Sequence, residues 1–388
     1  MRDYVEIGIG REARKAYRLG DISLVPSRRT RSSSDVDTSW HIDAYTFDMP
    51  LVAHPTDALA SPEFVIEMGK RGGLGVLNAE GILARHASFE EAVSRVVGSG
   101  VKSEVADSDY SISEFRRASR DTTAALQELH AAPLDHDLLS ERIAQVRDAG
   151  VTVAVRVSPQ NARELAPVVI KAGAELLFIQ GTVISAEYVK RGGEPLDLKE
   201  FIGSLEVPVI AGAVYDYTTA THLMRAGAAG VIVGSGAVSS YPSVGVGVPM
   251  ATAIADVAAA RREYLDETGG RYVHVIADGE ILSSGDVAAA IACGADAVML
   301  GLPLAQAEEA GGQGYYWESA AAHPRYPRGS VEPYDLFGKR IPLERVLHGP
   351  AAEPNGTTNV VGGLRRIMAK CGYTDIKSFQ KVGLTVQR

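Results

Sequence analysis

The chain has 388 residues, of which 46% are hydrophobic and 22% charged, a composition typical of one large globular barrel or two medium domains. A formal net charge of −9 argues against a nucleic-acid partner, and two distant cysteines, Cys293 and Cys371, argue against a disulfide framework or a zinc site. No apolar run approaches the roughly 18 residues of a membrane span, so we expect no membrane partner. The few cysteines favour a cytoplasmic protein, and we expect no metal.

A helical stretch that ends at glycine and runs into a short β-branched segment recurs along the chain. The glycine caps the helix in a left-handed conformation, and the apolar segment is typical of a strand buried on both faces. Five copies read KRGGLGVLNAEG, DAGVTVAVRVSP, KAGAELLFIQGT, RAGAAGVIVGSG and ACGADAVMLGLP, and MPLVAHP, VPVIAGA and RYVHVIADGE supply three more strands. Eight strands alternating with helices predict a (β/α)8 TIM barrel, a single domain over residues 1–388, with a doubly wound open sheet as the alternative.

Two segments exceed what a simple barrel needs. Residues 81–147 are too long for one crossover helix, so FEEAVSRVV and SEFRRASRDTTAALQEL are predicted as helices of an excursion after the second strand. Residues 305–388 are rich in Gly, Pro, Tyr and His and follow the eighth strand. We expect them to form a flap over the barrel mouth and a C-terminal segment.

The loops that follow the strands carry function in barrels of this kind. In chain order they hold His54-Pro55-Thr56-Asp57, Asn78-Ala79-Glu80, Ser158-Pro159, Gln180-Gly181-Thr182, Ala213-Val214, the run from Gly234 to Gly247, Asp278-Gly279-Glu280 and Gly301-Leu302. The sixth loop is rich in glycine, which lets backbone approach a ligand closely, but it contains no Cys, His or acid. Loops seven and eight occupy the usual phosphate-binding corner, where backbone N–H groups offer an anion site.

Several motifs in this order carry a family resemblance. They include LGDISLVPSRRTRSSSDVD, MPLVAHPTDALASPEF, AGAVYDYTTATHLMRAGAAGVIVGSG, GVGVPMATAIADVA and VIADGEILSSGDVAAAIACGADAVMLG. The chain resembles the IMP dehydrogenase/GMP reductase family, and within it the shorter IMP dehydrogenase-related branch that lacks the CBS pair. The resemblance implies a purine-nucleotide substrate such as IMP or GMP, NAD or NADP as cofactor, a homotetramer, and hydride transfer at a purine carbon.

The family's mechanism uses a loop cysteine that adds to the purine ring, because a thiolate is a strong nucleophile and a good leaving group. Counted back from GVGVP, that position falls at Val238, followed by Ser239 and Ser240. Valine cannot attack, and a serine without a neighbouring base is a poor nucleophile. Cys293 precedes the eighth strand, at the opposite end of the barrel, so we expect it to be a packing residue.

The resemblance also implies a set of binding residues. Those implied for substrate are Asp57, Gly234, Ser235, Gly236, Asp278, Gly279 and Gly301, and those implied for cofactor are Gly181 and Thr182. The chain also departs from the family pattern. Glu280 stands where the family has a phosphate-facing glycine, Leu302 where it has a serine, and Ala213 where it has an asparagine. The segment FIQGT lacks the acid that holds the cofactor's ribose in the family's dehydrogenases. A carboxylate about 4 Å from a phosphate opposes binding by roughly 1 kcal/mol even in water.

The sequence does not decide which residues are catalytic. Ser239, Arg325 and Tyr326 are candidates, the last two because the family's dehydrogenases use an Arg-Tyr pair on the flap to activate water. Asp57 either supports the pocket or caps the helix of SPEFVIEMGKRG, and His54 and His323 are either proton carriers or structural. The functions considered are a purine-nucleotide oxidoreductase, a catalytically silent nucleotide-binding protein that regulates partners, and an FMN-binding barrel.

Overall fold

The computed structural model describes residues 4–99, 112–189, 191, 196–236, 245–325, 329–334, 340–351 and 353–387, and it places eight parallel strands in one sheet. Their order is β6-β15-β14-β13-β12-β9-β8-β7. The strands are β6 (Leu51–Ala53), β7 (Val76–Asn78), β8 (Ala154–Val157), β9 (Leu176–Gln180), β12 (Val209–Val214), β13 (Gly230–Val233), β14 (His274–Ala277) and β15 (Ala297–Leu300). The first and last strands in this order are joined by a bridge between Val52 and Leu74, with the Ala53 N–H donating to the Leu74 carbonyl at 2.8 Å. The sheet is therefore a closed ring, which confirms the predicted (β/α)8 barrel and excludes the open sheet.

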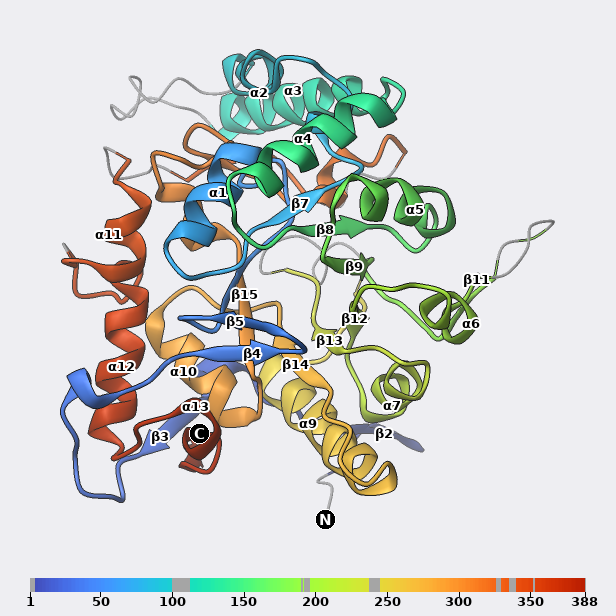
Figure 1. The fold of residues 1–388 in the computed structure, drawn as a ribbon. Helices are drawn as coiled ribbons and strands as arrows, with labels where there is room; N and C mark the ends of the chain where they lie inside the picture. The colour runs from blue at the N-terminus through green and yellow to red at the C-terminus, as the bar shows by residue number, and fades with distance from the viewer. Residues whose placement is uncertain are drawn as a thin grey trace.

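Helices cover the outside of the ring (Figure 1). Those between or beside barrel strands are α1 (Pro62–Lys70), α4 (His136–Asp148), α5 (Ala162–Ala172), α6 (Leu198–Gly203), α7 (Tyr217–Arg225), α9 (Met250–Glu267) and α10 (Ser284–Cys293). The predicted capping by glycine is present where α5 and α10 end, since Gly173 and Gly294 have φ of 121° and 120°. Between β7 and β8 lie η3 (Ile82–Ala84), α2 (Phe89–Gly98), α3 (Ile112–His130) and α4, which ends at Asp148 and leads into β8.

A short hairpin closes the end of the barrel at which the strands begin. It consists of β4 (Trp40–Ile42) and β5 (Tyr45–Phe47), whose Trp40 and Phe47 rings stack at 5.3 Å. These side chains share one buried cluster with the inward-facing residues of the strands, and Trp40 also contacts His274 at the start of β14. The hairpin therefore leaves only the opposite end open to a ligand.

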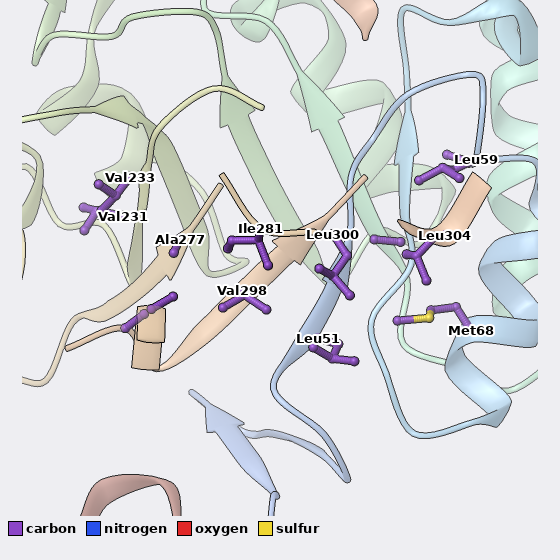
Figure 2. Packing of buried hydrophobic residues seen from close by; sticks show 14 of the residues in the cluster. Leu51, Leu59, Met68, Val231, Val233, Ala277, Ile281, Val298, Leu300 and Leu304 are labelled. Carbon is purple, nitrogen blue, oxygen red and sulfur yellow. The ribbon is translucent and has the colours of Figure 1, made fainter. Parts of the chain in front are cut away.

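The outer face of the sheet packs against the helices in a second, larger core. Figure 2 shows Leu51 of β6, Val298 and Leu300 of β15, and Met68 of α1 in this core. Burying one such aliphatic side chain contributes about 1.5–3 kcal/mol, so the strands are fixed from both faces. The loops that follow them are therefore held on a rigid frame.

The residues after Ala305 divide between the two ends of the barrel, so the expected flap corresponds to only part of residues 305–388. The pair β16 (Tyr315–Tyr316) and β17 (Glu332–Pro333) and the turn η6 (Ser319–Ala322) lie at the open mouth. In contrast, α11 (Leu343–His348) and α12 (Val360–Lys370) run along one side, and α12 packs on α10 (Figure 1). Finally α13 (Ile376–Phe379) reaches the closed end, and β18 (Gly383–Val386) pairs with β3 (Ile22–Val25) near the N-terminus.

The remaining elements lie outside the barrel sheet, and they include the short helices η1 (Leu19–Asp21) and η2 (Ser33–Asp35). The hairpins β1 (Tyr4–Gly8) with β2 (Arg11–Arg14) and β10 (Glu187–Tyr188) with β11 (Leu196–Asp197) are antiparallel pairs outside the barrel, and η5 (Leu302–Gln306) follows β15. None of the helices in the described ranges combines the length and apolar character needed to span a bilayer.

A buried carboxylate fastens α13 to the closed end of the barrel. Asp296 precedes β15, is 1% exposed, and accepts from Arg261 Nη1 of α9 at 2.7 Å and from the Val275 N–H at 2.8 Å. The Lys377 ammonium of α13 binds the other carboxylate oxygen. Burial alone would raise the pKa of Asp296, but the positive charges of Arg261 and Lys377 outweigh it and lower the pKa.

Candidate functional site

The strand period of two brings a layer of polar side chains to the open end of the barrel. In five strands an apolar residue belongs to the inner cluster, and the residue two positions later points the same way but is polar. These polar residues are His54, Asn78, Arg156, Gln180 and Asp278. Of these five, Arg156 was missed in the sequence, although its place two residues after the inward-facing Ala154 could have revealed it.

A cavity of about 720 Å³ lies above this layer. His54, Asn78, Arg156 and Gln180 line its floor, and the loops after the strands supply Glu80, Ser158, Gly181, Thr182 and Ser235. The segment after β16 contributes Glu318, Ser319, Ala320, Ala322, His323 and Pro324. Glu318 is 4% exposed and was also missed, because its sequence neighbours show no strand or loop pattern that would mark it.

Asp278 lies behind the floor and contacts two of its residues. It is 2% exposed, accepts from Gln180 Nε2 at 2.9 Å, and lies 3.4 Å from His54 Nε2. Burial alone would lower the pKa of His54, but Asp278, and to a lesser extent Glu318, outweigh it, so the pKa is raised. Among the described residues, His54 Nδ1 and Gln180 Oε1 are buried without a hydrogen-bond partner. These two atoms are acceptors that a ligand can use.

A second polar network, between Glu80 and Arg156, forms one wall. Arg156 donates to Asn78 Oδ1 at 3.2 Å and to the Gln180 carbonyl at 2.7 Å, and its Nη1 lies 3.4 Å from Glu80 Oε2. Ser158 Oγ donates to Glu80 Oε1 at 2.9 Å. Because both charges are partnered by the protein, this wall presents a rigid polar surface with little net charge.

Asp57 supports the cavity from behind. Its Oδ2 accepts from His130 Nε2 at 2.8 Å, and its Oδ1 accepts from the Ile82 N–H at 2.9 Å. His130 of α3 lines the cavity, so Asp57 ties the excursion helix to the loop after β7. The alternative of a helix cap is wrong, because the Ser61 side chain accepts from the Phe64 N–H and caps α1.

We expect Ser61→Ala to lower the free energy of unfolding by about 1 kcal/mol, because the first turn of α1 loses its cap. Urea unfolding followed by circular dichroism measures this loss. Ligand binding should not change, since Ser61 does not line the cavity. A loss no larger than that of Ser140→Ala, which changes a half-buried serine inside α4, would contradict the assignment of the cap.

The expected cofactor residues lie beside the floor. Gly181 and Thr182 line the cavity, and Ser235 Oγ is hydrogen-bonded to the Tyr215 hydroxyl at 2.7 Å. That hydroxyl also lies 3.4 Å from the Thr182 carbonyl. Tyr215 therefore connects the loops after β9 and β13 across the end of β12.

The expected nucleotide glycines do not line the cavity. A Cβ at Gly234 would overlap the Asp278 carbonyl, one at Gly236 the Glu318 carboxylate, and one at Gly301 the Tyr316 hydroxyl. At Gly279, with φ of 153°, a Cβ would meet the Gly236 carbonyl at 3.3 Å. These four positions need glycine because the chain packs closely on itself there.

The Glu280 carboxylate is hydrogen-bonded within the protein, so it is not an unpaired charge at the predicted phosphate-binding corner. It adopts a left-handed φ of 58°, and its carboxylate accepts from the Leu19 N–H at 3.1 Å and from the Met250 N–H at the start of α9. Burial raises the pKa of Glu280, although these hydrogen bonds oppose the shift. An acid at the start of α9 is favoured by the helix dipole, so the chain itself supplies an anion there.

The candidate catalytic residues are not brought together in the described part of the chain. Val238, Ser239, Ser240 and Tyr326 lie outside the described residues. Arg325 is exposed and does not line the cavity, whereas His323 does. Cys293 ends α10, packs against the core and has its pKa raised by burial to about 11, as befits a packing residue.

Comparison with known families identifies the barrel. The model of the IMP dehydrogenase / GMP reductase domain matches residues 16–341, which covers all eight strands and the segment that borders the cavity. The chain belongs to this family. The family assignment confirms the resemblance seen in the motifs.

Similar proteins extend over nearly the whole chain. An uncharacterized oxidoreductase of Mycolicibacterium smegmatis is 61% identical, covering 98% of this chain and 99% of its own. An inosine-5'-monophosphate dehydrogenase of Methanocaldococcus jannaschii is 27% identical, covering 95% and 92%. The crystal structure of an IMP dehydrogenase/GMP reductase-like protein from Corynebacterium glutamicum, 64% identical, superposes with a TM-score of 0.91 over 99% of this chain and 98% of that one.

Proposed function

We propose that the protein is an NAD(P)-dependent oxidoreductase of a purine nucleotide of the IMP or GMP type, and that it acts as a homotetramer. The observation that carries this proposal is the buried Asp278 carboxylate, which lies directly behind the floor residues Gln180 and His54. A fixed carboxylate that has little solvent is a strong acceptor for sugar hydroxyls. Family membership and the oxidoreductase relatives support the redox chemistry.

The residues beside Asp278 fit a nicotinamide cofactor. Gln180 Oε1 is a buried acceptor without a partner among the described residues, and it suits the carboxamide or ribose hydroxyl of such a group. Gly181 leaves room next to it, because an added Cβ would make only ordinary contacts, with Pro159 at 3.4 Å and the Val183 carbonyl at 3.7 Å. When bound there, the cofactor would accept or donate the hydride.

A silent nucleotide-binding protein is the second candidate, and one observation favours it. The cavity has no cysteine among its described lining residues, and Glu280 supplies an anion of its own near the expected phosphate corner. Without a cysteine the family's covalent adduct cannot form there, and an anion near the corner opposes binding of a phosphate. No observation of this kind favours a flavin, and a colourless purified protein would count against one.

Turnover assays separate the two candidates. We expect purified protein with IMP and NAD⁺, or with GMP and NADPH, to change the absorbance of the reduced nicotinamide steadily. The change should scale with enzyme concentration and disappear when either reactant is omitted. Tight nucleotide binding without any turnover would contradict the oxidoreductase and support the silent protein.

A further inference from the structure

His54 is held in a fixed position at the floor of the cavity. It directly follows β6, and its N–H donates to the Leu300 carbonyl of β15 at 2.8 Å, which anchors the backbone between two barrel strands. The residue is 7% exposed and lines the cavity. Such a side chain has little rotational freedom and contacts whatever fills the space above it.

The partner of one ring nitrogen determines what the other can do. His54 Nε2 lies 3.4 Å from Asp278 Oδ2, and a carboxylate beside Nε2 places the proton of the neutral ring on that nitrogen. Nδ1 is then an acceptor, and it has no partner among the described residues although it is buried. An Asp-oriented imidazole with an unpartnered ring nitrogen, on a residue that lines the cavity, has the arrangement of a general base.

The charges around His54 stabilise the ring after it takes up a proton. Asp278 after β14 and Glu318 after β16 both favour the charged imidazolium, and Arg156 of β8 opposes it. The balance leaves the pKa of His54 above its ordinary value of 6.5. Of the other histidines that line the cavity, His130 has its Nε2 hydrogen-bonded to Asp57 at 2.8 Å, and His323 Nδ1 accepts from the Arg325 N–H at 3.2 Å.

We propose that His54 Nδ1 accepts a proton from water at the reacting purine carbon, so that hydration takes the place of the family's thiol adduct. The water O–H bond breaks as the oxygen bonds to carbon. The electron pair of the ring C=N bond moves to nitrogen, which takes a proton from solvent, and the imidazolium later returns its own. The inference rests on the proposed function, because the hydrated carbon carries the hydrogen that leaves as hydride.

Proton counting tests this role without requiring turnover. Calorimetric titration of IMP in two buffers of different ionisation enthalpy, at pH 6.5, measures the protons released on binding. At that pH more than half of His54 is protonated, because its pKa is raised above 6.5. A ligand or water that donates to Nδ1 needs the neutral ring, so wild type should release more than half a proton per IMP, and His54→Gln close to none. His136→Gln, which changes a histidine outside the cavity, should match wild type.

Kinetics supply the second measurement. We expect His54→Gln to lower kcat by about 100-fold or more, the usual contribution of a general base, and to remove the fall in rate toward acid pH. Equal proton release by wild type and His54→Gln would overturn the inference while leaving the proposed function intact. Absence of any binding heat with IMP would instead overturn the proposed function and the inference with it. If His54→Gln fails to fold, histidine nitrogen NMR of wild type decides, since an Nδ1–H tautomer contradicts the proposal.

Discussion

Asp278→Asn should weaken binding of a purine nucleotide by about 10- to 100-fold, because hydrogen bonds to a charged acceptor contribute about 1.5–3 kcal/mol. Asparagine keeps the size of the side chain but lacks the negative charge that we propose binds the sugar hydroxyls. It also removes the charge that orients His54 Nε2 at 3.4 Å. Titration calorimetry with IMP measures the change in Kd.

Asp148→Asn is the matched control for this experiment. Asp148 ends α4, and its side chain is 68% exposed in an ion pair with Arg147, so its loss should leave nucleotide binding unchanged. Equal affinity of wild type and Asp278→Asn for IMP would show that the carboxylate does not hold the ligand. The melting temperatures of both variants should be compared first, so that a folding defect is recognised.

Asp296→Asn should lower the free energy of unfolding by about 3–5 kcal/mol, because it leaves the buried Arg261 guanidinium without its charge partner. The Arg261 side chain is only 6% exposed, so water cannot replace the lost carboxylate. Lys377→Met removes the other cation, whose side chain is 56% exposed, and should cost no more than about 1 kcal/mol. Chemical denaturation of the three proteins side by side gives these differences, and similar losses for the two variants would contradict the account.

The Asp296 carboxylate also makes the free energy of unfolding depend on pH in acid. Because the folded pKa of Asp296 is lowered, its contribution is present above the unfolded value of about 3.9 and is lost as pH falls through the folded pKa. Wild type should therefore lose stability below about pH 4 more steeply than Asp296→Asn. Melting temperatures recorded from neutral to acid pH check this difference in slope.

The barrel could be predicted because its signals are local. Five of the eight strands follow a glycine that ends a helical stretch, as at Gly173 and Gly294, and eight strands alternating with helices leave few topologies open. The hairpin of β4 and β5 was not predicted, because its three-residue strands are too short to show alternation. The pairing of β18 with β3 joins the two ends of the chain, and no local pattern indicates such a contact.

The site could be predicted only in part, for a similar reason. The loops after the strands pointed to Gly181, Thr182 and Ser235, which line the cavity, and to Asp278 behind its floor, since the end of a barrel strand fixes where its loop lies. Their roles in binding stay predictions. The pairing of Asp57 with His130 joins residues 73 positions apart, and the position of the α3 helix that creates it depends on tertiary packing. The direction of the Glu280 carboxylate was also hidden, because its left-handed backbone turns it toward Leu19.

A crystal structure of the protein soaked with millimolar IMP tests the central claim most directly. The account predicts density for the nucleotide in the cavity above the polar layer, with its sugar hydroxyls on the Asp278 carboxylate and its base next to His54. An unoccupied cavity at that concentration, or a nucleotide bound at another surface of the barrel, would contradict it.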